Sequence, residues 1–180
     1  MSVSVGSLSV SVTDAIIHTN YDTDVTLKNA SVKGENVAIE ALQTQHSDGS
    51  KVNVTAVTVG ALGVGVGYAG IFNKGATDVN ISDSTIQSTD NVTVSAKDES
   101  KHKTDITSVG VSAVGVATTF ASVENYSNVG VTLGGASNSI TTGKTIAIDA
   151  EKANALQAHT QGVGVGGVNV AVNHATIEDE

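Results

Sequence analysis

The sequence predicts an all-β fold, a parallel β-solenoid built from repeats of about 53 residues. Two observations predict it. A fifteen-residue pattern occurs four times in the chain, at 3–17, 57–71, 109–123 and 163–177. Within each copy apolar and polar residues alternate, which is the period of a strand, and no helical i, i+3, i+4 spacing is sustained.

The repeated pattern reads V-x-V-x-x-L/V-x-V-x-V/T-x-x-A-x-I/V. Stacking equivalent positions of a solenoid places identical side chains on one another, and such columns interlock without large aromatics. We therefore predict that the invariant alanine and the central valine of the pattern form the structural core of the repeat. These residues are Ala15, Ala69, Ala121 and Ala175, with Val10, Val64, Val116 and Val170.

The segments between the copies repeat as well. Residues 23–41, 77–96 and 129–150 share V-x-L/I, then S/T-V/I, then V/I-x-I/V-x-A. The chain is therefore expected to be one solenoid domain, 1–180, with repeats at approximately 3–56, 57–108 and 109–162 and a partial repeat at 163–180. A three-sided parallel coil uses about two dozen residues, so each repeat is expected to make roughly two coils from about six short strands.

The parity of the apolar positions changes within the pattern. In the second copy the apolar residues are odd-numbered at 57 and 59, even-numbered at 62, 64 and 66, and odd-numbered again at 71. Because a one-residue slip turns a strand over, each change predicts a bulge or corner. The alternative fold is an antiparallel sandwich or a closed barrel of tandem hairpins, but the only clear hairpin signal is "SDGS" at 47–50.

Composition excludes several classes of function. The formal charge is −9, Arg is absent and no basic run exists, so nucleic acid is not an expected partner. The absence of Cys excludes disulfides and thiolate sites. The N-terminus shows no signal peptide and no run of 18 apolar residues occurs, so we expect no membrane insertion by this segment.

No catalytic, cofactor or metal site is expected. The glycine-rich stretches 60–65 and 162–167 lack the Lys-Ser/Thr and the following helix of a phosphate loop. Some enzymes that cleave polysaccharides are parallel β-helices. Their catalytic carboxylates must converge on the substrate, and such a site would interrupt the repeat with an irregular insertion. In this chain no insertion between the repeats is longer than a few residues. The chain is therefore not expected to be an enzyme.

The histidines and the turn carboxylates are the candidates for metal binding. The histidines are His18, His46, His102, His159 and His174, and their spacings vary from copy to copy, unlike those of a zinc site. Asp22 with Asp24, or Asp83 with Asp90, could hold a loosely bound Ca²⁺ at a turn. Solvated turn carboxylates are the more ordinary interpretation of both pairs.

Residues 79–100, "VNISDSTIQSTDNVTVSAKDES", followed by the alternating tract 108–119, "SVGVSAVGVATT", resemble the passenger region of bacterial leukotoxin-type filamentous adhesins and haemagglutinin-like exoproteins. Those families alternate a unit of the first kind with a Gly/Ala/Val unit many times, and the resemblance covers essentially the whole chain. It implies a secreted or surface-displayed β-helical shaft, without a mapped binding site. A weaker similarity connects 57–70 with trimeric autotransporter heads, whose repeats are much shorter.

The expected function is therefore a structural and adhesive segment of a large filamentous adhesin, extracellular or on the bacterial cell surface. Its partner would be a component of a host or neighbouring cell, or a second copy. The alternative is a self-assembling extracellular fibre that stacks end to end, because exposed solenoid edges are templates for strand pairing. A third possibility is a toxin-like passenger that acts on host cells.

Overall fold

The computed structural model describes residues 1–44 and 49–180, and these residues form strands joined by short turns. The strands are β1 (Ser2–Lys28), β2 (Ser31–Gly34), β3 (Val37–Thr44), β4 (Ser50–Ser82), β5 (Thr85–Ser88), β6 (Asn91–Glu99), β7 (Lys101–Gly134), β8 (Ser139–Thr141), β9 (Thr145–Lys152), β10 (Ala155–Val165) and β11 (Val168–Asp179). Within the described ranges there is no helix of the length and apolarity needed to cross a membrane.

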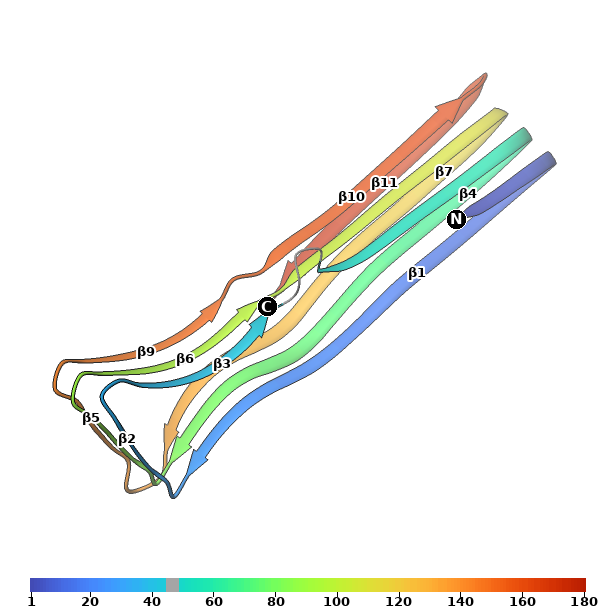
Figure 1. Cartoon of the computed structure of the whole chain (residues 1–180). Coiled ribbons are helices and arrows are strands. Elements are labelled where there is room, and N and C mark those ends of the chain that lie inside the picture. The colour runs from blue at the N-terminus through green and yellow to red at the C-terminus, as the bar shows by residue number, and fades with distance from the viewer. Residues whose placement is uncertain (45–48) are drawn as a thin grey trace.

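Every strand pair in the described residues is parallel, and the strands form three sheets (Figure 1). The long sheet has the order β1-β4-β7-β10, with β11 also paired to β7, and the two smaller sheets are β2-β5-β8 and β3-β6-β9. Each of the two smaller sheets thus takes one strand from each of the three full repeats. The predicted all-β fold with parallel sheets is confirmed, and the arrangement is compatible with a β-solenoid.

The backbone ladders join residues that lie one full repeat apart. Val10 pairs with Val64, Val64 with Val116, and Val116 with Val170, at separations of 54, 52 and 54 residues. Two coils per repeat would pair residues about half a repeat apart, and no such ladder occurs in the described ranges. The expectation of two coils per repeat is therefore wrong. Strands of 33 residues in β4 and 34 in β7 take the place of the short strands that were expected, so one coil uses the whole repeat.

Each long strand folds back on itself at one end of the molecule. The ladder of β4 is interrupted at Ala61 and that of β7 at Ala113, and residues on either side of these points contact one another. We call this two-layered end the arm; it consists of 54–69 and the ladder partners 2–15, 106–121 and 160–175, and it points to the upper right in Figure 1. The first predicted parity change, between 59 and 62, marks this turn.

The second parity change, between 66 and 71, is not a corner. β4 continues through it, and alternate residues keep facing the same side. Val66 lies on the outer side of the strand, whereas Ile71 is on the inner side and fully buried. The apolar residues therefore change faces while the backbone runs straight. The corner was predicted because apolar residues were assumed to point inward everywhere.

The interior of the arm is too thin for large side chains. Gly63 and Gly65 face inward toward Ser112 and Ser108 of the opposite layer. A Cβ atom on Gly65 would lie 3.1 Å from Ser108 Oγ, and one on Gly63 would lie 3.3 Å from Ser112 Cβ. Such distances are tighter than ordinary packing, so only glycine, serine and other small residues fit between the layers.

The central valine column therefore lies on the outer surface of the arm, and its assignment to the core is wrong. The exposed fractions are 56% for Val10, 37% for Val64, 42% for Val116 and 51% for Val170. The alanine column does face the interior. Ala69 and Ala121, in the two inner coils, are 0% and 2% exposed, whereas Ala15 is half-buried and Ala175 exposed in the outer coils.

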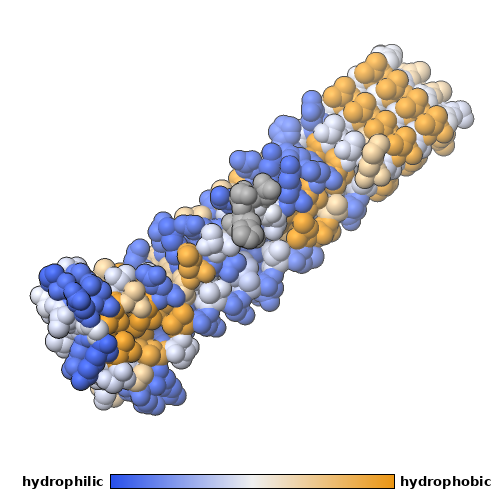
Figure 2. Space-filling view, in the orientation of Figure 1, coloured by the Kyte–Doolittle hydropathy of each residue, from blue (hydrophilic) through white to orange (hydrophobic). Residues whose placement is uncertain are grey.

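Two apolar clusters lie further along the interior. The larger fills the wide end, where the three sheets enclose Val37, Ala41, Val79, Ile81, Ile86, Val92, Val94 and Ala96. The second lies at the base of the arm and contains Val52, Val54, Ala69, Ile71, Ile106 and Ala121. Figure 2 shows apolar surface on the arm and again near the wide end, with polar surface along the middle of the molecule.

A ladder of polar side chains separates the two clusters. Thr19 Oγ1 donates to Asn73 Oδ1 (2.5 Å), Asn73 Nδ2 donates to Asn125 Oδ1 (2.5 Å), and Asn125 Nδ2 donates to Asp179 Oδ1 (2.9 Å). These four residues occupy one column of the long sheet, so the hydrogen bonds run from coil to coil. Asn73 and Asn125 are fully buried. A buried amide without a hydrogen-bond partner costs free energy. This column therefore favours the observed strand register over registers shifted by one residue.

Replacing Gly65 by valine tests the thinness of the arm. We expect Gly65→Val to destabilise the fold by about 1–3 kcal/mol, because the added methyl groups would overlap the facing layer. Gly65→Ala is the matched control, since Ala117 and Ala171 occupy the same column in the next coils, and its effect should be much smaller. Urea unfolding followed by circular dichroism measures both. Equal stability of the two variants would contradict the thin-arm description.

Candidate functional site

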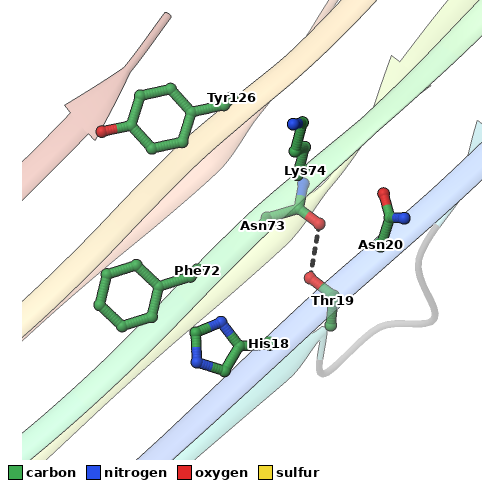
Figure 3. Close-up of a pocket in the computed structure, with 7 residues that line it drawn as sticks. All are labelled: His18, Thr19, Asn20, Phe72, Asn73, Lys74 and Tyr126. Atoms are coloured by element: carbon green, nitrogen blue, oxygen red, sulfur yellow. Dashed lines mark hydrogen bonds between the residues drawn. The ribbon is translucent and has the colours of Figure 1, made fainter.

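A hollow lies on the outer face of the long sheet, beyond the base of the arm (Figure 3). Its volume is about 460 Å³. Three adjacent coils contribute to it: β1, β4 and β7. The lining residues are His18, Thr19, Asn20, Phe72, Asn73, Lys74 and Tyr126. We call this the aromatic hollow, because three of its side chains carry rings.

The ladder register brings the lining residues together. His18 pairs with Phe72, and Asn20 pairs with Lys74, which in turn pairs with Tyr126. Alternate residues of a strand share a face, so the two columns lie side by side on the outer surface. The rings of His18 and Phe72 are stacked, with centroids 5.0 Å apart and an interplanar angle of 17°. Tyr126 faces them across the hollow in Figure 3.

Gly70 provides the space in which the Phe72 ring lies. A Cβ atom at Gly70 would lie 2.9 Å from Phe72 Cε2 and 3.1 Å from Tyr68 Cε1, so both rings lean over the glycine. In the other coils the ladder partners of this glycine are larger: Ile16, Ser122 and Thr176. The hollow is therefore specific to this place in the repeat array.

A second hollow of about 300 Å³ continues from the first along the sheet. It shares Asn20, Lys74 and Tyr126 with the aromatic hollow. Its other lining residues are Asp22, Gly75, Ala76 and Asn128. We call it the polar hollow and refer to the two together as the groove. The groove thus offers ring faces at one end and amide, ammonium and carboxylate groups at the other.

The electrostatics of the groove favour hydrogen bonding rather than acid–base chemistry at Tyr126. Burial, together with the carboxylates of Glu178 and Glu124, raises the pKa of Tyr126 to about 12. Its hydroxyl donates to Glu124 Oε2 at 3.3 Å. The phenol therefore stays protonated at neutral pH. The carboxylates of Glu124, Glu178 and Asp22 lie beside the groove, which disfavours a strongly anionic ligand.

Such a groove can hold a flat ligand with an apolar face and a polar edge. Ring faces bind the apolar side through stacking and burial, while Asn20, Lys74 and Tyr126 offer donors and acceptors to the edge. Among the described residues no group of three or more His, Cys, Asp or Glu side chains is placed to hold a metal ion.

The structure places the described histidines in different environments. His18 lines the aromatic hollow, and His102 is buried at 1% exposure. His159 Nδ1 lies 4.0 Å from Asp105 Oδ1, and His174 packs against Phe120 with ring centroids 6.2 Å apart. His46 falls outside the described residues.

Two of the four turn carboxylates that the sequence offered for Ca²⁺ have side-chain partners. Asp83 Oδ1 accepts a hydrogen bond from the Ala136 amide at 2.9 Å, and Asp90 forms an ion pair with Lys144 at 2.7 Å. Asp22 lines the polar hollow. The glycine-rich stretches 60–65 and 162–167 lie in the arm, at the turns between its layers.

Sequence reasoning missed the groove. The repeat pattern singled out neither Phe72 and Tyr126 nor Asn20 and Lys74. A signal was present, however, because the outward positions 18, 72 and 124 hold His, Phe and Glu, and the positions 20, 74 and 126 hold Asn, Lys and Tyr. These columns vary between copies where the skeleton of the repeat stays constant.

Comparison of the chain with protein-family models, with curated protein sequences and with solved structures finds no match.

His102 lies in the interior of the molecule, and neither of its ring nitrogens has a hydrogen-bond partner among the described residues. Burial lowers the pKa of His102 below 6.5, although the charges of Asp98 and Asp179 oppose this shift. The folded state therefore holds a neutral imidazole. The ladder partner of His102 in the outer coil is Leu156, so an apolar side chain suits the same position.

Acidification should destabilise the fold through His102. Because the folded pKa lies below the unfolded value of 6.5, the unfolded chain binds the proton more readily, and stability falls as pH drops below about 6.5. His102→Leu should remove this part of the pH dependence. His159→Leu, at an exposed histidine, should leave it in place. Urea unfolding at several pH values between neutral and mildly acidic measures this pH dependence. The same dependence of stability on pH in wild type and His102→Leu would contradict the role given to His102.

Proposed function

We propose that this chain is a structural and adhesive segment of a large secreted or surface-exposed bacterial filamentous protein, and that its groove binds a neutral carbohydrate. The observation that carries the proposal is the pair of outward columns that line the groove, because they differ from coil to coil on an otherwise repetitive scaffold. The proposal includes no catalytic step.

The scaffold suits a shaft. Continuous parallel ladders connect each coil to the next, and equivalent residues stack in columns. The stability of such an array is approximately a sum of coil terms and nearest-neighbour terms, so further coils extend it without a new core. The resemblance of residues 79–119 to filamentous adhesins supports the same function.

The groove suits a sugar chain. A pyranose ring has an apolar face of C–H groups and an edge of hydroxyls, which matches the ring faces of Phe72 and Tyr126 beside the polar groups of Asn20 and Lys74. The aromatic and polar hollows adjoin along the sheet, so an oligosaccharide could occupy both. The carboxylates of Glu124, Glu178 and Asp22 around the groove favour a neutral sugar over an acidic one.

Truncation of the stacked ring tests the binding site. We expect the chain to retain neutral oligosaccharides on a glycan array, and Phe72→Ala to weaken the affinity for the strongest of them at least about tenfold, because a stacking platform is lost. Phe120→Ala is the matched control, since Phe120 is an outward aromatic of the same sheet that lies outside the groove. Calorimetric titration gives the affinities.

A second substitution alters the shape of the hollow while Phe72 itself is kept. Gly70→Thr introduces the residue that Thr176 supplies at the same column in the outer coil. We expect the fold to persist, because position 70 faces outward, and carbohydrate binding to be lost, because the Phe72 ring would be displaced. The same calorimetric titration, with circular dichroism as the check on folding, measures both effects.

The proposal fails if the wild-type chain retains no glycan. It also fails if Phe72→Ala and Phe120→Ala bind equally well, because binding would then take place elsewhere on the surface.

A further inference from the structure

One outer face of the arm is apolar across all four coils. It consists of positions 8, 10 and 12 of the first coil and their ladder partners in β4, β7 and β11. Of these twelve residues eleven are leucine or valine and the other is Thr118. We call this surface the valine face.

The exposure of the valine face does not depend on the outermost coils. In the two inner coils, which have a neighbouring strand on each side, Leu62 is 50% exposed, Val64 37%, Val114 48% and Val116 42%. Neighbouring strands within the sheet therefore do not cover these side chains. Any further coil would pair with the edge of the sheet and leave the face open.

The valines cannot be turned inward. Gly63, Gly65 and Gly115 occupy the inner side of the same strand segments, and a Cβ atom at any of the three would lie within 3.3 Å of a serine side chain. A one-residue slip would place valines in this space and glycines outside. The same strand register therefore places glycine in the thin interior of the arm and valine on its outer surface.

The area of the valine face reaches the upper end of the range found for apolar patches on monomers. A fully exposed valine or leucine side chain presents on the order of 100 Å² of apolar surface, so twelve side chains at about half exposure present on the order of 600 Å². The largest apolar patch on a monomeric protein is usually about 300–600 Å². A standard interface buries about 800 Å² on each partner, and the adjoining Tyr68 and Phe120 bring the face close to that area.

We infer that the valine face is an interface with a second copy of this chain. Rows of similar side chains repeat at the strand spacing of about 4.8 Å, so two such faces related by a two-fold axis can interdigitate as packed sheets do, about 10 Å apart. No residue of the face is charged, so the net charge of −9 does not oppose the contact locally.

A lipid surface suits this face less well. Proteins that bind membranes at their surface combine apolar residues with Lys, Arg or Trp near the headgroups. The chain contains neither Arg nor Trp, and no Lys belongs to the valine face. The interface lies on the arm and involves none of the groove residues, so it stands independently of the proposed carbohydrate site.

The mass of the chain in solution tests the inference. We expect light scattering coupled to size exclusion to give twice the chain mass of 18.0 kDa at micromolar concentration, without further growth. The double variant Val64→Lys, Val116→Glu should halve the mass, because the two charges pair with each other across the ladder and cannot be buried against a second copy. Its net charge equals that of the wild type, and circular dichroism checks that it folds.

Leu42→Glu is the matched control. Leu42 is 57% exposed on β3, away from the arm, and its ladder partner Lys97 can receive the new charge. This variant should remain dimeric. A monomeric wild type overturns the inference, and so does a dimer that the double variant leaves intact. Growth of the mass without limit as concentration rises would show stacking through strand edges instead. Loss of vesicle binding in the double variant, with a monomeric wild type, would assign the face to lipid.

Discussion

The parallel ladder between each residue and its copy one coil away is the constraint on which the rest of the structure depends. It fixes which side chains share a column, and it does so over 26 paired positions between β1 and β4 alone. Inward columns must then hold side chains of compatible size, as Ala69 and Ala121 do. Outward columns carry no such restriction, so they can repeat or vary.

The distance between the layers decides what each inward column contains. At the wide end the short β2-β5-β8 sheet holds the layers apart, and Ile81, Ile86 and Val92 fill the space. In the arm the layers meet directly, so glycine and serine replace the large residues. Between these regions Asn73 and Asn125 hydrogen-bond from coil to coil. Each such bond adds only about 1 kcal/mol net, but a slipped register would leave buried amides without partners.

The valine face and the groove both lie on the outer surface of the long sheet, but their residues differ in how strictly they repeat. The valine face arises where the outward residues are leucine or valine in nearly every coil, which produces a self-complementary apolar surface. The groove arises where they differ, because Phe72 lies over a glycine and stacks on His18 of the neighbouring coil. Repetition thus suits association between identical chains, and variation suits recognition of a distinct ligand. Both surfaces are attached to one rigid ladder.

The sequence by itself determined the all-β class, the repeat and its register, because equivalent residues such as Ala15, Ala69 and Ala121 recur at the separations that the ladders use. It also located the turn of the arm through the parity change near Ala61. It could not tell the number of coils per repeat, since alternation is the same in a long strand and in several short ones. Only the tertiary structure decided that Val64 faces water and Ile71 the interior, because that choice depends on the distance between layers. The groove likewise required the structure, since His18, Phe72 and Tyr126 meet only when three coils lie side by side.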